Sequence, residues 1–205
     1  MMDNINFLLA GVGGQGTILA SDVLVNVGLA AGFQAKQAEV HGMSQRGGSV
    51  TSFVRWGEAV HSPLVGKGEV DVLLSFEKLE ALRSLSQLRQ GAVALINNQV
   101  IEPLTVITGG MTYPSDEEIQ KAFVTVTDRA VFIDGEAIAK ELGNVHVANV
   151  VLLGALSALL ERELEACTTL TPDLRLQVIT SRVPPKHVEL NKMAFHAGRE
   201  AVGVK

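Results

Sequence analysis

Six residues near the start of the chain, Gly11-Val12-Gly13-Gly14-Gln15-Gly16, have the composition of a loop that binds an anionic group. The apolar run 5–10 before them predicts a buried strand, and the apolar spacing over 17–31 predicts a helix. A glycine-rich turn from a strand into a helix directs free backbone N–H groups and the positive end of the helix dipole towards one crevice. We therefore expect a phosphate or a carboxylate at this turn.

The same glycines allow two other interpretations. Gly11, Gly13 and Gly16 fit the G-x-G-x-x-G spacing of a dinucleotide-binding loop. Glu39 would then bind the adenosine ribose, although it lies farther from the first glycine than the ~20 residues typical of that fold. In the third interpretation, the glycines only let the helix pack closely on the strand.

A second polar loop, His41-Gly42-Met43-Ser44-Gln45-Arg46-Gly47-Gly48, follows a predicted strand at 34–40. In an open α/β sheet, ligands bind at the carboxyl ends of the strands, which is where both loops are expected. The two adjacent glycines permit close approach of another surface, and the Arg46 guanidinium can pair with a carboxylate or a phosphate. The alternative is an ordinary surface loop with a solvated arginine.

The segment 146–160 is apolar on nearly all sides, which predicts a helix that is buried in the protein or against a partner subunit. A buried polar group without a partner costs about 1–3 kcal/mol. Asn149 on this helix therefore either satisfies buried backbone groups or binds a ligand. His146 shares its face and is expected to be structural.

Strands alternating with helices predict the elements that position these residues. The fold class is α/β, with a Rossmann-like, open, mostly parallel but mixed sheet that has helices on both faces, in one domain over residues 1–205. The strand at 5–10, the first helix and the strand at 34–40 form a βαβ unit with a parallel pair. A hairpin joining 49–56 to 59–62 through Gly57-Glu58 makes the sheet mixed.

Further strands are expected at 70–76, 92–96 and 131–133, with short extended pieces at 100–101 and 106–107 around Pro103. Further helices are expected at 77–90, after a capping box at Ser115 and Glu118, after a cap at Asp134, after Thr171-Pro172, and through 190–198.

Composition limits the function. The formal net charge is −5 and no basic run occurs, so we expect no nucleic-acid partner. The single cysteine, Cys167, excludes a disulfide within the chain, a zinc site with several thiolates and a Cys₄ iron–sulfur cluster, and it suggests a cytoplasmic protein. No uninterrupted apolar stretch reaches about 18 residues, so we expect no membrane span. No metal site and no catalytic residue can be assigned.

Four motifs in order resemble one family over almost the whole chain. The first glycine loop resembles the opening motif of the gamma subunit or gamma domain of pyruvate/2-oxoacid:ferredoxin oxidoreductases. The loop at 39–48 is similar to the version in indolepyruvate ferredoxin oxidoreductase beta subunits. The segments 149–154 (Asn-Val-Val-Leu-Leu-Gly) and 191–198 (Asn-Lys-Met-Ala-Phe-His-Ala-Gly) are similar to later motifs of the family.

The resemblance implies oxidative decarboxylation of a 2-oxoacid with coenzyme A, giving an acyl-CoA, carbon dioxide and reduced ferredoxin. Thiamine diphosphate and 4Fe-4S clusters would belong to a larger partner subunit, and this chain would bind no cofactor by itself and be inactive alone. Gln15 and Arg46 would help to hold the phosphates of the coenzyme or the substrate carboxylate. The residues expected to face a ligand or the partner are Gly11, Gly13, Gly14, Gln15, Gly16, Thr17, Glu39, His41, Gly42, Ser44, Gln45, Arg46, Gly47, Gly48 and Asn149.

Two alternatives stay open at this point. One is an NAD(P)-binding Rossmann oxidoreductase that uses Glu39. The other is a non-enzymatic sensor or interaction module that binds a nucleotide.

Overall fold

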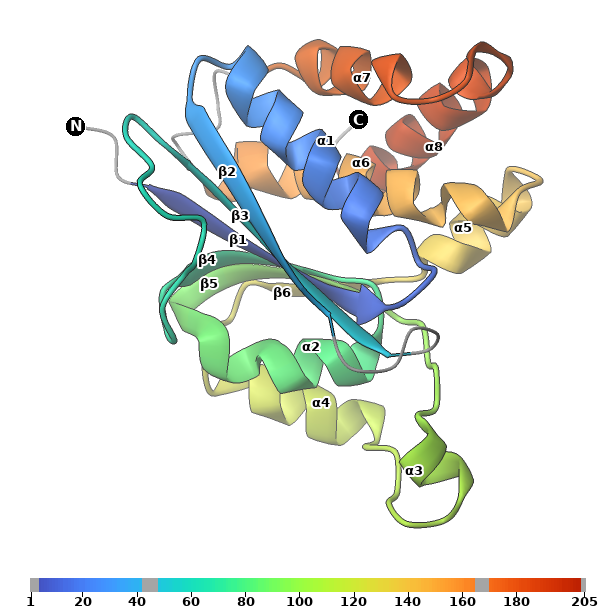
Figure 1. The fold of residues 1–205 in the computed structure, drawn as a ribbon. Helices are drawn as coiled ribbons and strands as arrows, with labels where there is room; N and C mark the ends of the chain where they lie inside the picture. The colour runs from blue at the N-terminus through green and yellow to red at the C-terminus, as the bar shows by residue number, and fades with distance from the viewer. Residues whose placement is uncertain (1–3, 42–47, 165–169, 204–205) are drawn as a thin grey trace.

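Six strands form one mixed sheet in the order β2-β3-β1-β4-β5-β6 (Figure 1). The computed structural model describes residues 4–41, 48–164 and 170–203. Neighbours from β1 through β4 and β5 to β6 are parallel, whereas β3 is antiparallel to both of its neighbours. The strands are β1 (Ile5–Val12), β2 (Gln34–His41), β3 (Ser49–Gly57), β4 (Val70–Ser75), β5 (Leu88–Asn97) and β6 (Ala130–Ile133).

Helices cover both faces of the sheet, as predicted (Figure 1). One face carries α1 (Thr17–Ala30), α5 (Gly135–Glu141), α6 (Ala148–Glu163), α7 (Pro172–Ser181) and α8 (Val188–Ala201). The other face carries α2 (Lys78–Ser84) and α4 (Asp116–Val124), and a short helix α3 (Leu104–Ile107) stands beyond them. A separate apolar core lies on each face, so the sheet is buried on both sides and its central strands read as continuous apolar runs.

The predicted βαβ unit is wrong in one respect. β1 and β2 run in the same direction but are not neighbours, because β3 lies between them and pairs with both. The sheet is mixed for this reason, and not because of the predicted hairpin at Gly57-Glu58. That hairpin does not form: residues 59–62 are not a strand, and β3 instead returns from β2 across residues 42–48.

Two other element predictions need correction. The helix predicted over 77–90 ends at Ser84, a 3₁₀ turn follows at Leu85–Gln87, and β5 already begins at Leu88. Gly91, the residue after the predicted end of that helix, lies inside β5 with φ of +70°, where its backbone N–H donates to Val126 O at 2.9 Å. Residues 106–107, expected to be extended, belong to α3.

Several terminal signals are confirmed. Ser115 and Glu118 form the predicted capping box of α4, and the Asp134 carboxyl accepts from Ala137 N at 2.9 Å at the start of α5. Pro172 is the first residue of α7. These caps satisfy backbone N–H groups that have no partner within their own helix, which explains why they mark boundaries so well.

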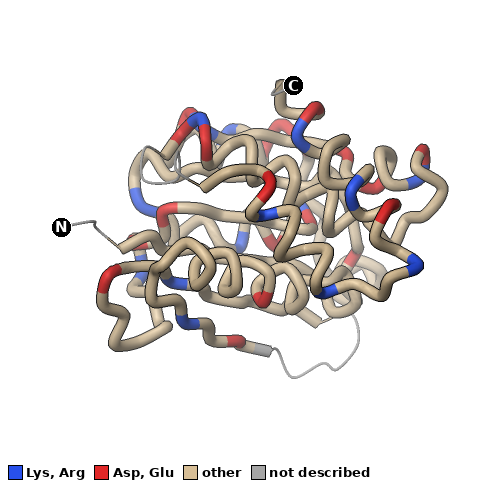
Figure 2. The backbone as a smooth tube through the Cα atoms, turned by 90° about the horizontal axis from the view of Figure 1, so that it is seen from above, with Lys and Arg blue, Asp and Glu red and all other residues tan. Residues whose placement is uncertain are grey.

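The apolar helix α6 is buried within the fold. The segment Val145–Glu163 is long and apolar enough by length and composition to cross a membrane, but 72% of it is buried in the structure, which fits a core helix. Its Gly154 lies against α8, where an added Cβ would come within 2.0 Å of Phe195 O. In the view from above, acidic and basic positions alternate around the described chain rather than separating into two faces (Figure 2).

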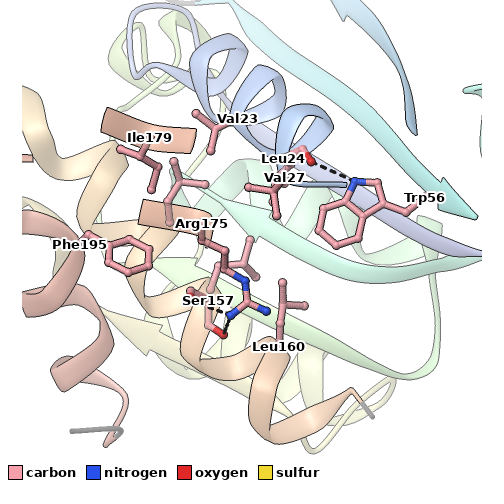
Figure 3. A pocket seen from close by; sticks show the side chains of 11 residues that line it. Val23, Leu24, Val27, Trp56, Ser157, Leu160, Arg175, Ile179 and Phe195 are labelled. Carbon is pink, nitrogen blue, oxygen red and sulfur yellow. Dashed lines mark hydrogen bonds between the residues drawn. The ribbon is translucent and has the colours of Figure 1, made fainter. Parts of the chain in front are cut away.

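A small cavity of about 20 Å³ lies among α1, α6, α7 and α8 (Figure 3). Its lining is mostly apolar, and the Arg175 guanidinium at its edge donates to Ser157 O at 3.0 Å and Ser157 Oγ at 2.9 Å. Nearby, Trp56 Nε1 donates to Leu24 O at 3.0 Å. A space of this size holds at most about one water molecule, so it is a packing gap in the core and not a ligand site.

Candidate functional site

The glycine loop connects the end of β1 to the start of α1. Gly11 and Val12 still belong to β1, so the turn is shorter than the sequence suggested and begins at Gly13. Gly14 and Gly16 have φ of +103° and +83°, backbone conformations in which only glycine is unstrained. Gly16 is the N-cap of α1, and no described side chain caps this helix. The first N–H groups of α1 are therefore available to a ligand.

The Gln15 side chain shapes this loop. Its Oε1 accepts from Val12 N at 2.6 Å, and its Nε2 donates to Phe76 O at 2.9 Å and to Gln99 Oε1 at 2.7 Å. Gly11 makes room for it, since a Cβ there would lie 2.9 Å from Gln15 Oε1. Both amide protons of Gln15 are used, so in this structure the side chain fastens the loop to the ends of β4 and β5.

A polar cleft of about 180 Å³ opens beside the loop. Asn97 supports its floor, donating through Nδ2 to Phe76 O at 3.1 Å and accepting through Oδ1 from Gly135 N at 2.9 Å. The cleft therefore lies at the carboxyl ends of the parallel strands, where open α/β sheets bind ligands. Its lining residues are Gly14, Gln15, Gly16, Phe76, Asn97, Gln99, Glu136, Val145, His146, Ala148, Asn149 and Leu152.

Two long helices begin at this cleft. Gly16 precedes α1, and α6 continues from a 3₁₀ turn at Val145–Val147, whose preceding residue Asn144 accepts from His146 N at 3.0 Å. The N-terminus of a helix carries about half a positive charge, so the two ends together favour a negatively charged group. Glu136 is the acidic residue in the lining, at the far side on α5.

Asn149 is the polar side chain best placed to bind that group. It is 9% exposed, lines the cleft, and makes no hydrogen bond with any residue that the structure describes. Its Nδ2 lies 2.6 Å from the point where a Cβ of Gly16 would be, so the amide covers the start of α1. A carboxamide donor beside free backbone N–H groups can bind a phosphate or a carboxylate.

Thr17 lies next to this arrangement but faces inward. It is 3% exposed, and its Oγ1 has no hydrogen-bond partner among the described atoms. Oγ1 would lie 2.9 Å from a Cβ at Gly11, which places the hydroxyl under the loop, close to the strand end.

The second predicted loop begins and ends beside the first. His41 ends β2 opposite Val50, and Gly13 N donates to Gly48 O at 3.0 Å. The end of the second loop, just before β3, therefore contacts the glycine loop at the same edge of the sheet. The predicted site residues Gly42, Ser44, Gln45, Arg46 and Gly47 lie outside the described residues.

Glu39 lies apart from the cleft. It is opposite Ser52 of β3, and Ser52 is in turn opposite Leu9 of β1, so a whole strand separates Glu39 from β1. In a dinucleotide-binding fold, the acidic residue ends the strand directly beside β1. That relationship is absent among the described strands, which counts against binding of an adenosine ribose by Glu39.

Sequence reasoning missed most of the cleft wall. The residues not predicted are Phe76, Asn97, Gln99, Glu136, Val145, Ala148 and Leu152, and His146 was expected to be only structural. Asn97 carried a usable signal, because it follows an apolar strand whose carboxyl end faces the ligand edge of an α/β sheet.

The family of the chain follows from its relatives. The sequence profile of the family described as pyruvate ferredoxin/flavodoxin oxidoreductase matches residues 6–201. This chain belongs to that family. It is 41% identical over 207 residues to indolepyruvate oxidoreductase subunit IorB of Pyrococcus horikoshii, covering 98% of this chain and 96% of the relative. It is 32% identical to 2-oxoglutarate synthase subunit KorC of Methanothermobacter marburgensis, covering 95% and 94%.

Solved structures of the family have the same fold. The gamma subunit of a keto/oxoacid ferredoxin oxidoreductase from Geobacter sulfurreducens matches with a TM-score of 0.68 and 24% identity, covering 97% of this chain and 98% of that chain. A 2-oxoglutarate:ferredoxin oxidoreductase from Magnetococcus marinus, solved with 2-oxoglutarate, coenzyme A and succinyl-CoA bound, matches with a TM-score of 0.71 and 18% identity. The match covers 98% of this chain but 31% of that one.

The chain is therefore a subunit of the 2-oxoacid:ferredoxin oxidoreductase type, which confirms the family resemblance of its four motifs. The NAD(P)-binding alternative is not favoured by these relatives, in agreement with the position of Glu39.

Proposed function

We propose that this chain is the small subunit of an enzyme that oxidatively decarboxylates an aryl 2-oxoacid, with indolepyruvate as the first candidate. The choice of indolepyruvate as substrate rests on the relative from Pyrococcus horikoshii, an indolepyruvate oxidoreductase subunit that is 41% identical over 98% of this chain. The products would be an acyl-CoA and carbon dioxide, with the electrons passing to ferredoxin. The proposal includes a single domain over residues 1–205 and a cytoplasmic location.

The redox cofactors would reside in a larger partner subunit, and the chain alone would be inactive. A Cys₄ cluster needs four thiolates, and the sequence has only Cys167. Among the described residues, no three His, Cys, Asp or Glu side chains are grouped so that they could hold a metal ion. The single cysteine therefore does not fit a 4Fe-4S cluster held by four thiolates of this chain.

The cleft beside the glycine loop is the proposed contact with coenzyme A or with the substrate carboxylate. Support comes from the uncapped start of α1 and from the Asn149 side chain, which lines the cleft and has no hydrogen-bond partner among the described residues. The Magnetococcus marinus enzyme that contains this fold was solved with coenzyme A and succinyl-CoA bound. A phosphate of the coenzyme would accept hydrogen bonds from the loop N–H groups and from Asn149 Nδ2, with Arg46 contributing from the neighbouring loop.

A steady-state assay of the reconstituted two-subunit complex tests this proposal. Indolepyruvate, pyruvate and 2-oxoglutarate are compared as substrates, in the wild type and in Asn149→Ala. A hydrogen bond to a charged group contributes about 1.5–3 kcal/mol, so the KM for coenzyme A should rise about tenfold or more, with little change in kcat. Asn26→Ala is the matched control, because Asn26 bonds to Asp22 on α1, away from the cleft.

The outcomes separate the parts of the proposal. A rise in the KM for the 2-oxoacid instead of coenzyme A would identify the substrate carboxylate as the bound group. Unchanged constants in both Asn149→Ala and Arg46→Ala would remove the cleft from the site. Activity of the isolated chain, or saturable binding of NADH to it, would refute the proposed division of labour.

A further inference from the structure

The segment 100–113, which we name the arm, extends from the body of the protein between β5 and α4. Figure 1 shows its helix α3 standing away from the sheet, beyond α2 and α4. Within the described chain, α3 packs against no other helix or strand to any substantial extent. The arm is internally ordered, since Thr108 N donates to Leu104 O at 2.9 Å and Met111 N donates to Thr105 O at 3.1 Å.

The arm exposes large apolar side chains. Leu104 is 73% exposed, Ile107 and Met111 are each 65% exposed, and Val100 is 46% exposed. The only charged residue in the segment is Glu102. Clustered apolar exposure with few charges is typical of a protein–protein contact, because buried interface cores are depleted of charged residues.

One buried carboxyl holds both ends of the arm. Glu77 is 1% exposed, and its Oε1 accepts from Ile101 N at 3.1 Å and from the Tyr113 hydroxyl. The Tyr113 oxygen in turn accepts from Leu79 N at 3.1 Å, and Lys78 N donates to Gln99 O at 3.1 Å just before the arm begins. A fixed base lowers the entropy lost on docking, so the arm is preorganised to bind.

The comparison of chain lengths indicates what covers the arm. In the Magnetococcus marinus enzyme, the matching fold is 31% of a longer chain, so it is covalently joined to further parts of that chain. This chain instead spans 96% of its relative from Pyrococcus horikoshii, which is itself a separate subunit. Contacts with those further parts can form within one chain in the first enzyme, whereas here they would form between subunits through exposed surface.

We propose that the arm docks into an apolar groove of the larger, cofactor-bearing subunit. This inference rests on the proposed function, because that function requires such a subunit. Leu104 and Ile107 are the anchors, and Glu77 is the positioning residue that fixes the base. The arm begins directly after Gln99, which lines the cleft and bonds to Gln15, so docking also sets the position of one cleft wall.

The test is the affinity of the co-expressed larger subunit from the same source for the double variant Leu104→Glu, Ile107→Glu. We expect dissociation to become about thirtyfold easier or more, as for loss of central interface anchors. Leu29→Glu is the matched control, since Leu29 is 52% exposed on α1, on the opposite face of the sheet. Both variants should keep the wild-type melting temperature, because the replaced side chains are exposed.

Each outcome has one meaning. If the double variant forms the complex as well as the wild type does, docking through the arm is refuted and the proposed function is unaffected. A wild-type chain that binds no larger subunit refutes the proposed function itself. A wild-type chain that forms homodimers in light scattering, lost in the double variant, overturns the assignment by making a second copy the occupant.

Discussion

Gly14 and Gly16 lie two residues apart in the glycine loop. Replacing each by alanine separates the cost of backbone strain from the cost of displacing a neighbouring side chain. Both have left-handed backbone conformations, with φ of +103° and +83°. An added Cβ at Gly14 would meet nothing within 4 Å, whereas one at Gly16 would lie 2.6 Å from Asn149 Nδ2. Gly14→Ala therefore reports backbone strain alone, and Gly16→Ala reports the same strain plus displacement of Asn149.

The magnitudes follow from these two terms. A left-handed conformation costs a residue with a Cβ about 1–2 kcal/mol, partly offset by the ~0.4–1 kcal/mol that alanine gains from a less flexible unfolded chain. We expect Gly14→Ala to lower the free energy of unfolding by about 1 kcal/mol. Forcing Asn149 from its rotamer adds about 0.5–1.5 kcal/mol. Gly16→Ala should therefore cost about 2 kcal/mol, or about 4–8 °C in Tm for a chain of this length.

Urea and thermal unfolding of both variants, alone and combined with Asn149→Ala, measure the coupling. Removing the Asn149 amide leaves only its Cβ, 3.3 Å from the new methyl group, so the cost of Gly16→Ala should fall to that of Gly14→Ala. The reasoning is refuted if the two glycine variants are equally stable in the wild-type background. It is also refuted if Asn149→Ala does not reduce the cost of Gly16→Ala.

Three further predictions concern the rest of the fold. Burial and the adjacent Glu77 carboxyl raise the pKa of Tyr113, the only tyrosine in the chain. Ultraviolet titration of the folded protein should therefore show no phenolate near pH 10. The free energy of unfolding should fall as pH rises above 10, because Tyr113 then loses its proton in the unfolded chain but keeps it in the folded one. Gly198→Ala should lower the free energy of unfolding in urea by about 2–3 kcal/mol, because its Cβ would lie 1.9 Å from a carbonyl oxygen of α6. The control Gly135→Ala should lower it by under about 1 kcal/mol, because the nearest contacts of that Cβ are side chains at 3.2 Å. Glu161→Gln weakens the ion pairs of two buried arginines, Arg175 and Arg199, and should lower the free energy of unfolding by about 3 kcal/mol in thermal unfolding. Glu189→Gln, which affects an exposed pair with Lys192, should lower it by under about 1 kcal/mol.

Local signals predicted the elements well, whereas their pairing could not be read from the sequence. The run at 70–76 formed a strand because a short apolar stretch buried on both faces has few other solutions. The position of β3 between β1 and β2 depends on contacts between residues far apart in the chain, for which no local pattern exists. The false hairpin at Gly57 arose in the same way: β3 already has a neighbour on each side, so no edge remains for residues 59–62.

In the candidate site, too, local patterns predicted some residues, and the order of the strands determines the others. The glycine motif predicted Gly14 and Gly16, and the cost of burying an amide singled out Asn149, since both arguments are local. Gln99 and Glu136 come from later parts of the chain, and only the order of the parallel strands brings them to the loop. Gln15 was predicted to bind an anion, and this stays a prediction, although in the structure both of its amide protons are engaged by the protein.

Those two Gln15 bonds connect the two proposals. Gln15 Nε2 donates to Gln99 Oε1 at 2.7 Å, and the Gln99 carbonyl accepts from Lys78 N, beside the buried carboxyl of Glu77. The glycine loop, one wall of the cleft and the base of the arm therefore share one hydrogen-bonded unit at the carboxyl ends of β1, β4 and β5. The proposed partner that binds the arm would therefore also fix the position of the glycine loop, through the hydrogen bonds of Gln15 and Gln99. The proposed small subunit would contribute to catalysis in this way, by presenting an amide-lined surface at a position that the proposed partner sets.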